Sequence, residues 1–172
     1  MSFLNLDVEE ECLAEFTQLL KGKTKFAIFK LSDDKKSVIR DLPEGAENTE
    51  NIEAKPEGTS TYDYFVSRLP ENEPRFAFYN YCITIEGGYG RADRDKVSFV
   101  SWCPEYSPIK GKMIHASTKS GLVKHLGEDK IAKEFQAASE ADITQDEIVE
   151  QFNAMGNVKV AGKIVAFEGE EI

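Results

Sequence analysis

The chain has 172 residues, of which 41% are hydrophobic, enough to form one domain with its own core without metal ions or disulfide bonds. The formal net charge of −10 disfavours nucleic acids and anionic membranes as general partners, because both hold proteins mostly through summed positive charge. No run of about 18 apolar residues is present, and the N-terminus lacks the basic flank and apolar core of a signal peptide, so no integral membrane association is expected.

The first part of the sequence predicts a helix, a hairpin, a loop and a second helix. Apolar residues at steps of three and four predict a helix over residues 8–20. Short β-branched and aromatic runs predict a hairpin with strands 25–31 and 37–42. The acidic segment 44–58, punctuated by Gly and Pro, predicts a mobile surface loop or a short insertion. Capping residues followed by helical steps predict the second helix over residues 59–69.

The middle of the sequence predicts two central strands and a long helix. The strands are expected at 75–85 and 96–103, joined by a Gly-rich polar turn. Ser107 followed by Pro108 is typical of a helix start, with the serine as N-cap and the proline at the first helical position. The helix is expected to span residues 108–126, and the following glycine ends it.

One stripe of this long helix is expected to face the core, with its lysines off the stripe or at its border. The stripe comprises Ile109, Met113, Ala116 and Val123, and the lysines are Lys110, Lys112, Lys119 and Lys124.

The last part of the sequence predicts a strand at 131–137, a capped helix at 144–152 and an additional strand at 158–167, followed by an acidic end. This order of elements predicts an α/β fold in which a mixed sheet is packed between helices. We expect one domain over residues 1–156 and a C-terminal extension, 157–172, that carries the extra strand and an acidic tail.

Charge is distributed unevenly along the chain. Residues 91–125 contain seven Lys or Arg against three Asp or Glu, a local charge of +4, which leaves 14 basic and 28 acidic residues, or −14, elsewhere. A basic segment on an acidic protein favours a defined docking surface for an acidic partner. Ordinary solvated charge is the alternative.

Residues 96–126 resemble the signature of the actin-depolymerising factor/cofilin family. A hydrophobic strand ends in Trp-x-Pro, a proline-started helix reads Pro-x-Lys-x-Lys-Met, and Ala-Ser-Thr-Lys follows. The segments YDYF, LPEN and RFAFYN also resemble family segments, so the resemblance covers roughly residues 4–155. The signature residues are Trp102, Pro104, Pro108, Lys110, Lys112, Met113, Ala116, Ser117, Thr118 and Lys119.

The resemblance implies the family fold, a five- or six-stranded mixed sheet sandwiched between helices. It also implies the family activity: binding to monomeric and filamentous actin with preference for the ADP state, filament severing and depolymerisation, by binding rather than by catalysis. A monomeric protein of the cytoplasm and the actin cytoskeleton is expected, with a nuclear pool as well. The alternative is a module of the coactosin-like type, which binds filament sides without severing.

The resemblance also implies the site residues. Those expected to contact actin at the N-terminus and on the long helix are Leu4, Asn5, Lys110, Lys112 and Met113. Met113 also fits the apolar stripe, so a place in the core stays open for it. The residues expected on the filament-specific surface are Arg94, Lys96 and Glu150.

The chain departs from the family pattern at three positions in the predicted helices or next to them. Gly111 stands where the family has a small polar residue, which either loosens the helix or allows closer approach to actin. Gln151 and Ala154 stand where the family has arginines, and the lost charge predicts weaker filament-side affinity.

Two regulatory features are implied as well. Phosphoinositide headgroups are expected to bind Lys110, Lys112, Lys119 and Lys124 by charge, weakly and in a salt-sensitive way. Phosphorylation of Ser2 would repel an acidic partner, although the register places Leu4 at the usual serine position.

Nothing in the sequence favours an enzyme or a cofactor. His115 and His125 lack carboxylate or cysteine partners at ligand spacing, and the GGYG segment is typical of a turn, not of a phosphate-binding loop. The cysteines lie far apart without CxxC spacing, so buried free thiols are favoured over disulfides or a metal site; they are Cys12, Cys82 and Cys103.

Overall fold

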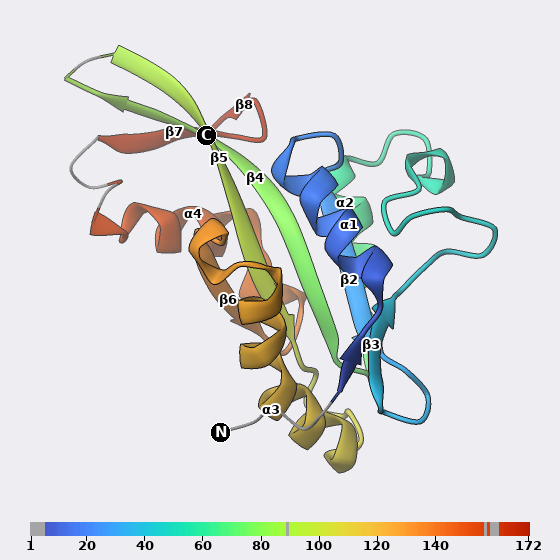
Figure 1. Cartoon of the computed structure of the whole chain (residues 1–172). Helices are drawn as coiled ribbons and strands as arrows, with labels where there is room; N and C mark the ends of the chain where they lie inside the picture. The colour runs from blue at the N-terminus through green and yellow to red at the C-terminus, as the bar shows by residue number, and fades with distance from the viewer. Residues whose placement is uncertain (1–5, 89, 157, 159–161) are drawn as a thin grey trace.

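The computed structural model describes residues 6–88, 90–156, 158 and 162–172, which form a mixed β-sheet with helices on both faces (Figure 1). Six strands follow one another in the order β1-β3-β2-β4-β5-β6, while β7 pairs with β4 and β8 with β7. β1 runs parallel to β3 and β6 parallel to β5, and the other pairs are antiparallel. The strands are β1 (Asp7–Val8), β2 (Phe26–Leu31), β3 (Ser37–Arg40), β4 (Arg75–Gly87), β5 (Gly90–Trp102), β6 (Lys133–Ala137), β7 (Lys163–Phe167) and β8 (Glu170–Glu171).

The helices cover opposite faces of the sheet. α1 and α3 pack on the face that receives Phe76 and Phe78 of β4, and α2 and α4 pack on the face that receives Ala77 and Tyr79. Because successive side chains of a strand point to opposite faces, β4 contributes to two cores, which explains its nearly continuous apolar sequence. The helices are α1 (Glu10–Leu20), α2 (Thr61–Ser67), α3 (Ile109–Leu126) and α4 (Gln145–Asn153), with short 3-10 helices η1 (Ile52–Ala54), η2 (Glu128–Lys130) and η3 (Glu140–Ile143).

The predicted α/β fold, a mixed sheet packed between helices, is confirmed. The described residues contain eight strands rather than five or six, because β7 and the two-residue strands β1 and β8 join the sheet. Within these residues, none of the helices has the length and apolar composition needed to cross a lipid bilayer. The division of the chain at residue 156 stays a prediction.

The start of the first helix differs from its prediction. The helix begins at Glu10 instead of Val8, because Asp7 and Val8 pair with Ser37 and Val38 of β3. The apolar side chain of Val8 therefore belongs to a strand whose two residues are too few to show a periodicity.

The hairpin of β4 and β5 departs most from the sequence prediction. The expected long turn over residues 86–95 is wrong, because the two strands stay paired as far as Gly87 and Gly90. The outer part of β5, GRADRDK, is exposed or half-buried along its whole length. It extends beyond the helices, as Figure 1 shows, so it needs no apolar residues and its composition is that of a turn. We call this projecting part, residues 83–87 and 90–96, the arm.

The segment 44–58 is tied down at its middle, so the prediction of a wholly mobile loop is wrong there. Thr49 and Glu50 are buried. The Glu50 carboxylate accepts hydrogen bonds from the backbone N–H groups of Lys25 and Phe26 at the start of β2. Glu15 of α1 accepts from the Thr49 N–H at 3.2 Å and from its hydroxyl at 2.9 Å. Burial raises the pKa of both carboxyl groups, because it disfavours their charged forms.

The C-terminal segment is more structured than expected at its end. The strand predicted over 158–167 is shorter: β7 spans Lys163–Phe167 and Val158 lies in the core, while residues 157 and 159–161 lie outside the described residues. The expected acidic tail includes a strand, since Glu170–Glu171 pair with β7.

All three cysteines are free thiols, as predicted, but only Cys12 is buried. Cys82 and Cys103 are half-buried, so the burial prediction is wrong for these two.

Candidate actin-binding surfaces

Helix α3 is fixed to the body of the protein by a buried stripe that combines a glycine and two polar side chains with two leucines. The buried residues are Gly111, His115, Thr118, Leu122 and Leu126. The predicted apolar stripe is therefore wrong for Ile109, Met113 and Ala116, which are exposed, whereas Val123 is half-buried and packs against the core. Sequence hydrophobicity missed the buried face because three of its five residues are glycine, histidine and threonine.

His115 anchors the middle of α3. Its Nε2–H donates a hydrogen bond to the carbonyl oxygen of Arg75 at 3.0 Å, and its ring stacks on Phe76 with centroids 4.4 Å apart. Burial lowers the pKa of His115 to about 4, because the charged form would lose its hydration. The histidine is therefore neutral at physiological pH and serves as a structural contact.

The start of α3 also differs from the predicted cap. The helix begins at Ile109 with Pro108 in the N-cap position, and no side chain caps it. The Ser107 hydroxyl is buried and has no hydrogen-bond partner among the described residues, so its predicted role as N-cap is wrong. Gly111 is buried, and a Cβ atom there would meet Pro74 at 3.8 Å, an ordinary contact distance. Gly111 thus faces the protein body and not the solvent.

The opposite face of α3 and the segment just before the helix carry exposed apolar side chains. Tyr106, Ile109 and Met113 are 84%, 77% and 67% exposed. This places Met113 on the surface and excludes it from the core. Large apolar side chains gathered in the open are typical of a docking site for another protein. Tyr106 was not identified from the sequence, and Ile109 was assigned to the core. Ile109 and Met113 are four residues apart, so they lie on the same face of the helix.

Two lysines border this apolar group. At about 3.6 residues per turn, Lys110 and Lys112 lie on opposite sides of Met113. Lys110 is exposed and Lys112 half-buried. The first turn of α3 contains no acidic residue, and its backbone N–H groups add further positive potential. We call Tyr106, Ile109, Lys110, Lys112 and Met113 the α3 surface.

The arm carries the second group of predicted residues. Arg94 pairs in register with Ile83 and Lys96 with Tyr81, and both partners belong to the core under α2 and α4. Because side chains alternate along a strand, Arg94 and Lys96 point to the sheet face that α4 covers. Glu150 is exposed on α4. We call Arg94, Lys96 and Glu150 the arm surface. Figure 1 shows the projecting ends of β4 and β5 at the other end of the molecule from the start of α3.

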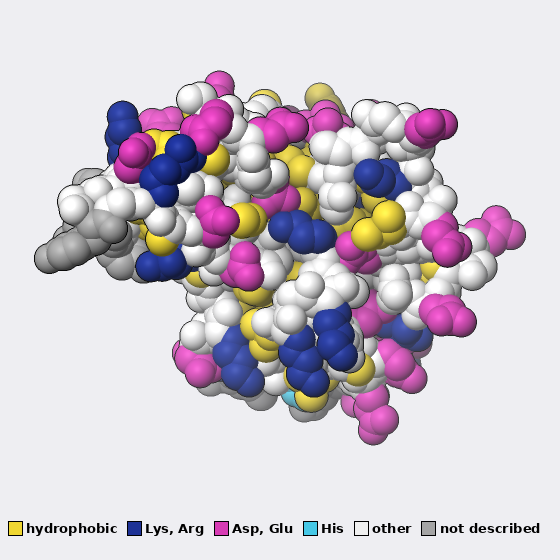
Figure 2. Space-filling view, turned by 90° about the horizontal axis from the view of Figure 1, so that it is seen from above, with side chains coloured by type: hydrophobic (Ala, Val, Ile, Leu, Met, Phe, Trp, Pro, Cys, Tyr) yellow, Lys and Arg dark blue, Asp and Glu magenta, His cyan; other side chains and the backbone are white. Residues whose placement is uncertain are grey.

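The predicted phosphoinositide residues do not gather in one place. Lys124 lies fourteen residues after Lys110, about 20 Å along the helix. The Lys119 ammonium group forms an ion pair with Glu134 of β6 at 2.9 Å. Figure 2 shows the view from above, in which Lys and Arg side chains stand in small groups between Asp and Glu.

The N-terminal residues of the predicted site lie outside the described residues. These are Ser2, Leu4 and Asn5, and the expectations for them stay predictions.

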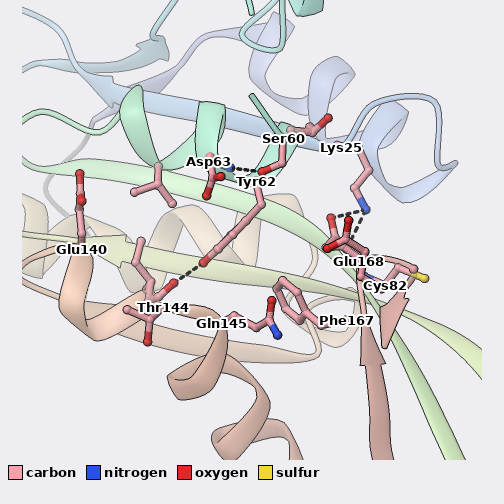
Figure 3. Close-up of a pocket in the computed structure, with 15 residues that line it drawn as sticks. Lys25, Ser60, Tyr62, Asp63, Cys82, Glu140, Thr144, Gln145, Phe167 and Glu168 are labelled. Carbon is pink, nitrogen blue, oxygen red and sulfur yellow. Dashed lines mark hydrogen bonds and ion pairs between the residues drawn. The ribbon is translucent and has the colours of Figure 1, made fainter. Parts of the chain in front are cut away.

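A pocket of about 770 Å³ opens between α2, the start of α4 and the turn from β7 to β8 (Figure 3). It contains none of the predicted site residues. Its main charged pair is Lys25 and Glu168, 3.1 Å apart, and burial raises the pKa of the Cys82 thiol, which keeps the sulfur protonated. No group of three or more His, Cys, Asp or Glu side chains suited to a metal ion occurs in the part of the chain that the structure describes.

Comparison with known proteins supports the resemblance. The sequence model of the family described as cofilin/tropomyosin-type actin-binding protein matches residues 5–153. Cofilin from Cryptococcus neoformans is 34% identical over 143 residues, which cover 83% of this chain and 91% of the relative. Actophorin from Acanthamoeba castellanii is 32% identical over 146 residues, covering 84% and 92%.

A solved structure agrees with these relatives. The crystal structure of Streptomyces griseoflavus cofilin superposes with a TM-score of 0.63 at 28% identity, covering 85% of this chain and 96% of the other. Family model, relatives and fold therefore lead to one conclusion: the chain belongs to the cofilin/tropomyosin-type actin-binding protein family.

Proposed function

We propose that this protein binds actin monomers and filaments through the α3 surface, prefers the ADP state, and severs and depolymerises filaments. The observation that carries the proposal is the exposure of Ile109 and Met113, 77% and 67%, between Lys110 and Lys112. Such an arrangement joins apolar contact area to positive charge at the start of one rigid helix.

The two kinds of side chain in the α3 surface have different roles. Lysines attract an acidic partner over a distance and fix its orientation, which raises the association rate. Methionine is flexible and polarizable, so Met113 can fill irregular gaps in a docked interface. Burial of apolar area then supplies most of the binding free energy.

The arm surface is proposed to contact a filament in addition. Arg94 and Lys96 supply positive charge there, and Glu150 is exposed on α4. Gln151 and Ala154 bring no charge where family members carry arginine, so this contact is proposed to be weak. That departure favours the second candidate, a coactosin-like module that decorates filaments without severing them.

We propose that the protein acts by binding and not by catalysis. Two charged groups of its pocket, Lys25 and Glu168, are paired with each other, and burial keeps the Cys82 thiol protonated, so neither Lys25 nor Cys82 is an activated nucleophile. A monomeric protein of the cytoplasm, the actin cytoskeleton and the nucleus fits this role.

Phosphoinositide headgroups are proposed to compete with actin for Lys110 and Lys112, with Lys119 and Lys124 as secondary contacts. Because these lysines are spread along α3, each headgroup would meet few of them, and binding should fall steeply with salt. Co-sedimentation with phosphoinositide vesicles at two salt concentrations tests this, and equal vesicle binding at both would contradict it.

Two measurements test the proposed function. Co-sedimentation with filaments measures binding, and time-resolved microscopy of labelled filaments measures breakage. The proposal expects the protein to pellet with filaments and to increase the number of filament ends over time. Decoration without breakage would favour the coactosin-like candidate, and absence of both monomer and filament binding would contradict the proposal.

A further inference from the structure

One edge of β4 is shared by two strands that lie end to end. β2 pairs with residues 76–79, and β7 pairs with residues 83–86 farther along the same strand. β5 covers the whole opposite edge. Without β7, the arm would be a two-stranded ribbon, and such ribbons are only marginally stable in water. β7 thus turns the base of the arm into a three-stranded sheet.

Glu168 joins β7 to the body of the sheet at the point where β2 and β7 meet. Its N–H donates to the carbonyl oxygen of Cys82 at 2.8 Å, and the Cys82 N–H donates to its carboxylate at 2.7 Å. The same carboxylate accepts from the Tyr79 hydroxyl and pairs with Lys25 of the segment before β2 (Figure 3). Glu168 has φ of 52°, a left-handed conformation that costs free energy in a non-glycine residue. Its side-chain contacts hold it there.

The C-terminal strands also contact α4 and the outer part of the arm. The Ile164 N–H donates to the side-chain oxygen of Asn153 in α4 at 3.1 Å. Ile164 and Phe167 share a core with Phe152 of α4. From β8, Glu171 forms an ion pair with Arg91 of β5. One short segment therefore touches both elements that carry the arm surface.

Gly162 is the residue that lets this segment approach the arm. Its φ of 143° is a conformation that glycine favours, and a Cβ atom there would overlap the carbonyl oxygen of Glu86. A side chain at this position would push the start of β7 away from β4.

We propose that β7 and β8 form a brace that fixes the arm relative to α4, so that Arg94, Lys96 and Glu150 meet a filament as one surface. This inference rests on the proposed function for its binding consequence. A fixed arm loses less conformational freedom on binding, so the brace raises filament affinity without contacting actin. The α3 surface lies elsewhere and does not depend on it.

The test compares Gly162→Ala with a control, Gly58→Ala. Gly58 also has a positive φ, 81°, but has no atom within 4 Å of an added Cβ, so the control shares the backbone strain without the overlap. For Gly162→Ala we expect arm amides to exchange hydrogen at least roughly tenfold faster than in the control. We expect filament affinity to fall roughly tenfold and affinity for actin monomers to stay the same.

A second variant, Glu168→Ala, adds no atom and tests the same junction if Gly162→Ala does not fold. It removes the acceptor of the Cys82 N–H and the partner of Lys25, and the same pattern is expected with smaller changes. Unchanged arm exchange, or faster exchange with unchanged filament affinity, would overturn the inference. Equal loss of monomer and filament binding would also overturn it. Failure of the unaltered protein to bind filaments would instead refute the proposed function, while arm exchange would still report on the brace.

Discussion

The α3 surface and the arm surface differ in what they expose and in how they are held. The α3 surface exposes three large apolar side chains, Ile109 and Met113 on α3 and Tyr106 just before it, and the other face of the helix is buried. The arm, in the part of the chain that the structure describes, exposes charged and polar residues and is held along its edge by β7. Apolar burial supplies affinity, whereas exposed charge mainly sets orientation and association rate. The α3 surface should therefore dominate binding to any form of actin, and the arm should act only on filaments.

The largest expected effect is that of Lys110→Glu with Lys112→Glu. Two reversed charges beside the apolar group would face an acidic partner as like charges, and we expect monomer and filament affinity to fall roughly 1,000-fold. Co-sedimentation and monomer titration measure the loss. The control is Lys21→Glu with Lys23→Glu, which makes the same change in net charge at two exposed lysines outside both surfaces. Wild-type binding by the α3 variant would place the actin contact elsewhere.

A second effect concerns the anchor under the α3 surface. The pKa of His115 is lowered to about 4 from its ordinary value of 6.5, so the unfolded state binds more protons than the folded state between these values. Its contribution to the free energy of unfolding is therefore complete above pH 6.5 and falls by about 3 kcal/mol as the pH drops to 4.

Urea unfolding of the unaltered protein and of His115→Gln over this pH range measures that loss. His115→Gln should not show this loss of unfolding free energy between pH 6.5 and 4. Glu15 and Glu50 have raised pKa values, so their contribution to the free energy of unfolding falls as pH rises, opposite to that of His115. Both proteins contain these two residues, so this contribution cancels in the difference between them. If the unfolding free energies of the two proteins changed with pH in parallel, neutral His115 would not be the anchor of α3.

A smaller effect is expected from Arg94→Glu with Lys96→Glu. Reversing charges on the arm should weaken filament binding roughly tenfold at low salt, with a smaller change at high salt because exposed charges are screened. Monomer affinity should match that of Lys21→Glu with Lys23→Glu. If monomer binding also fell tenfold, the proposed separation between the two surfaces would be wrong.

The smallest effect comes from adding charge next to the arm. Gln151→Arg with Ala154→Arg should strengthen filament binding about threefold, because a charge at the rim of an interface contributes little. Sedimentation at several protein concentrations would resolve this change. Equal affinity before and after the substitution would show that the last turn of α4 does not reach the filament.

The same contrast explains what could be predicted from the sequence. Strands with dense apolar residues, such as β2 and the inner part of β4, were located correctly because burial on both faces leaves a clear pattern. The outer part of β5 was mistaken for a turn because it lies in solvent and its hydrogen bonds to β4 leave no trace in composition. β8 and β1 have two residues each, too few for a periodicity.

The α3 surface shows a different limit. Lys110 and Lys112 were identified through the family motif and not through charge alone. Periodicity assigned Ile109 to the core and left that place open for Met113, because an exposed apolar side chain and a buried one look the same in a sequence. Only the structure shows that the buried face of α3 is instead formed by Gly111, His115, Thr118, Leu122 and Leu126.

Titration of labelled ADP-actin monomers with the purified protein in low-salt buffer tests the central claim most directly, because monomers need only the α3 surface. We predict saturable, equimolar binding that Lys110→Glu with Lys112→Glu removes and Arg94→Glu with Lys96→Glu leaves intact. Absence of binding by the unaltered protein, or loss of binding through the arm variant alone, would contradict it.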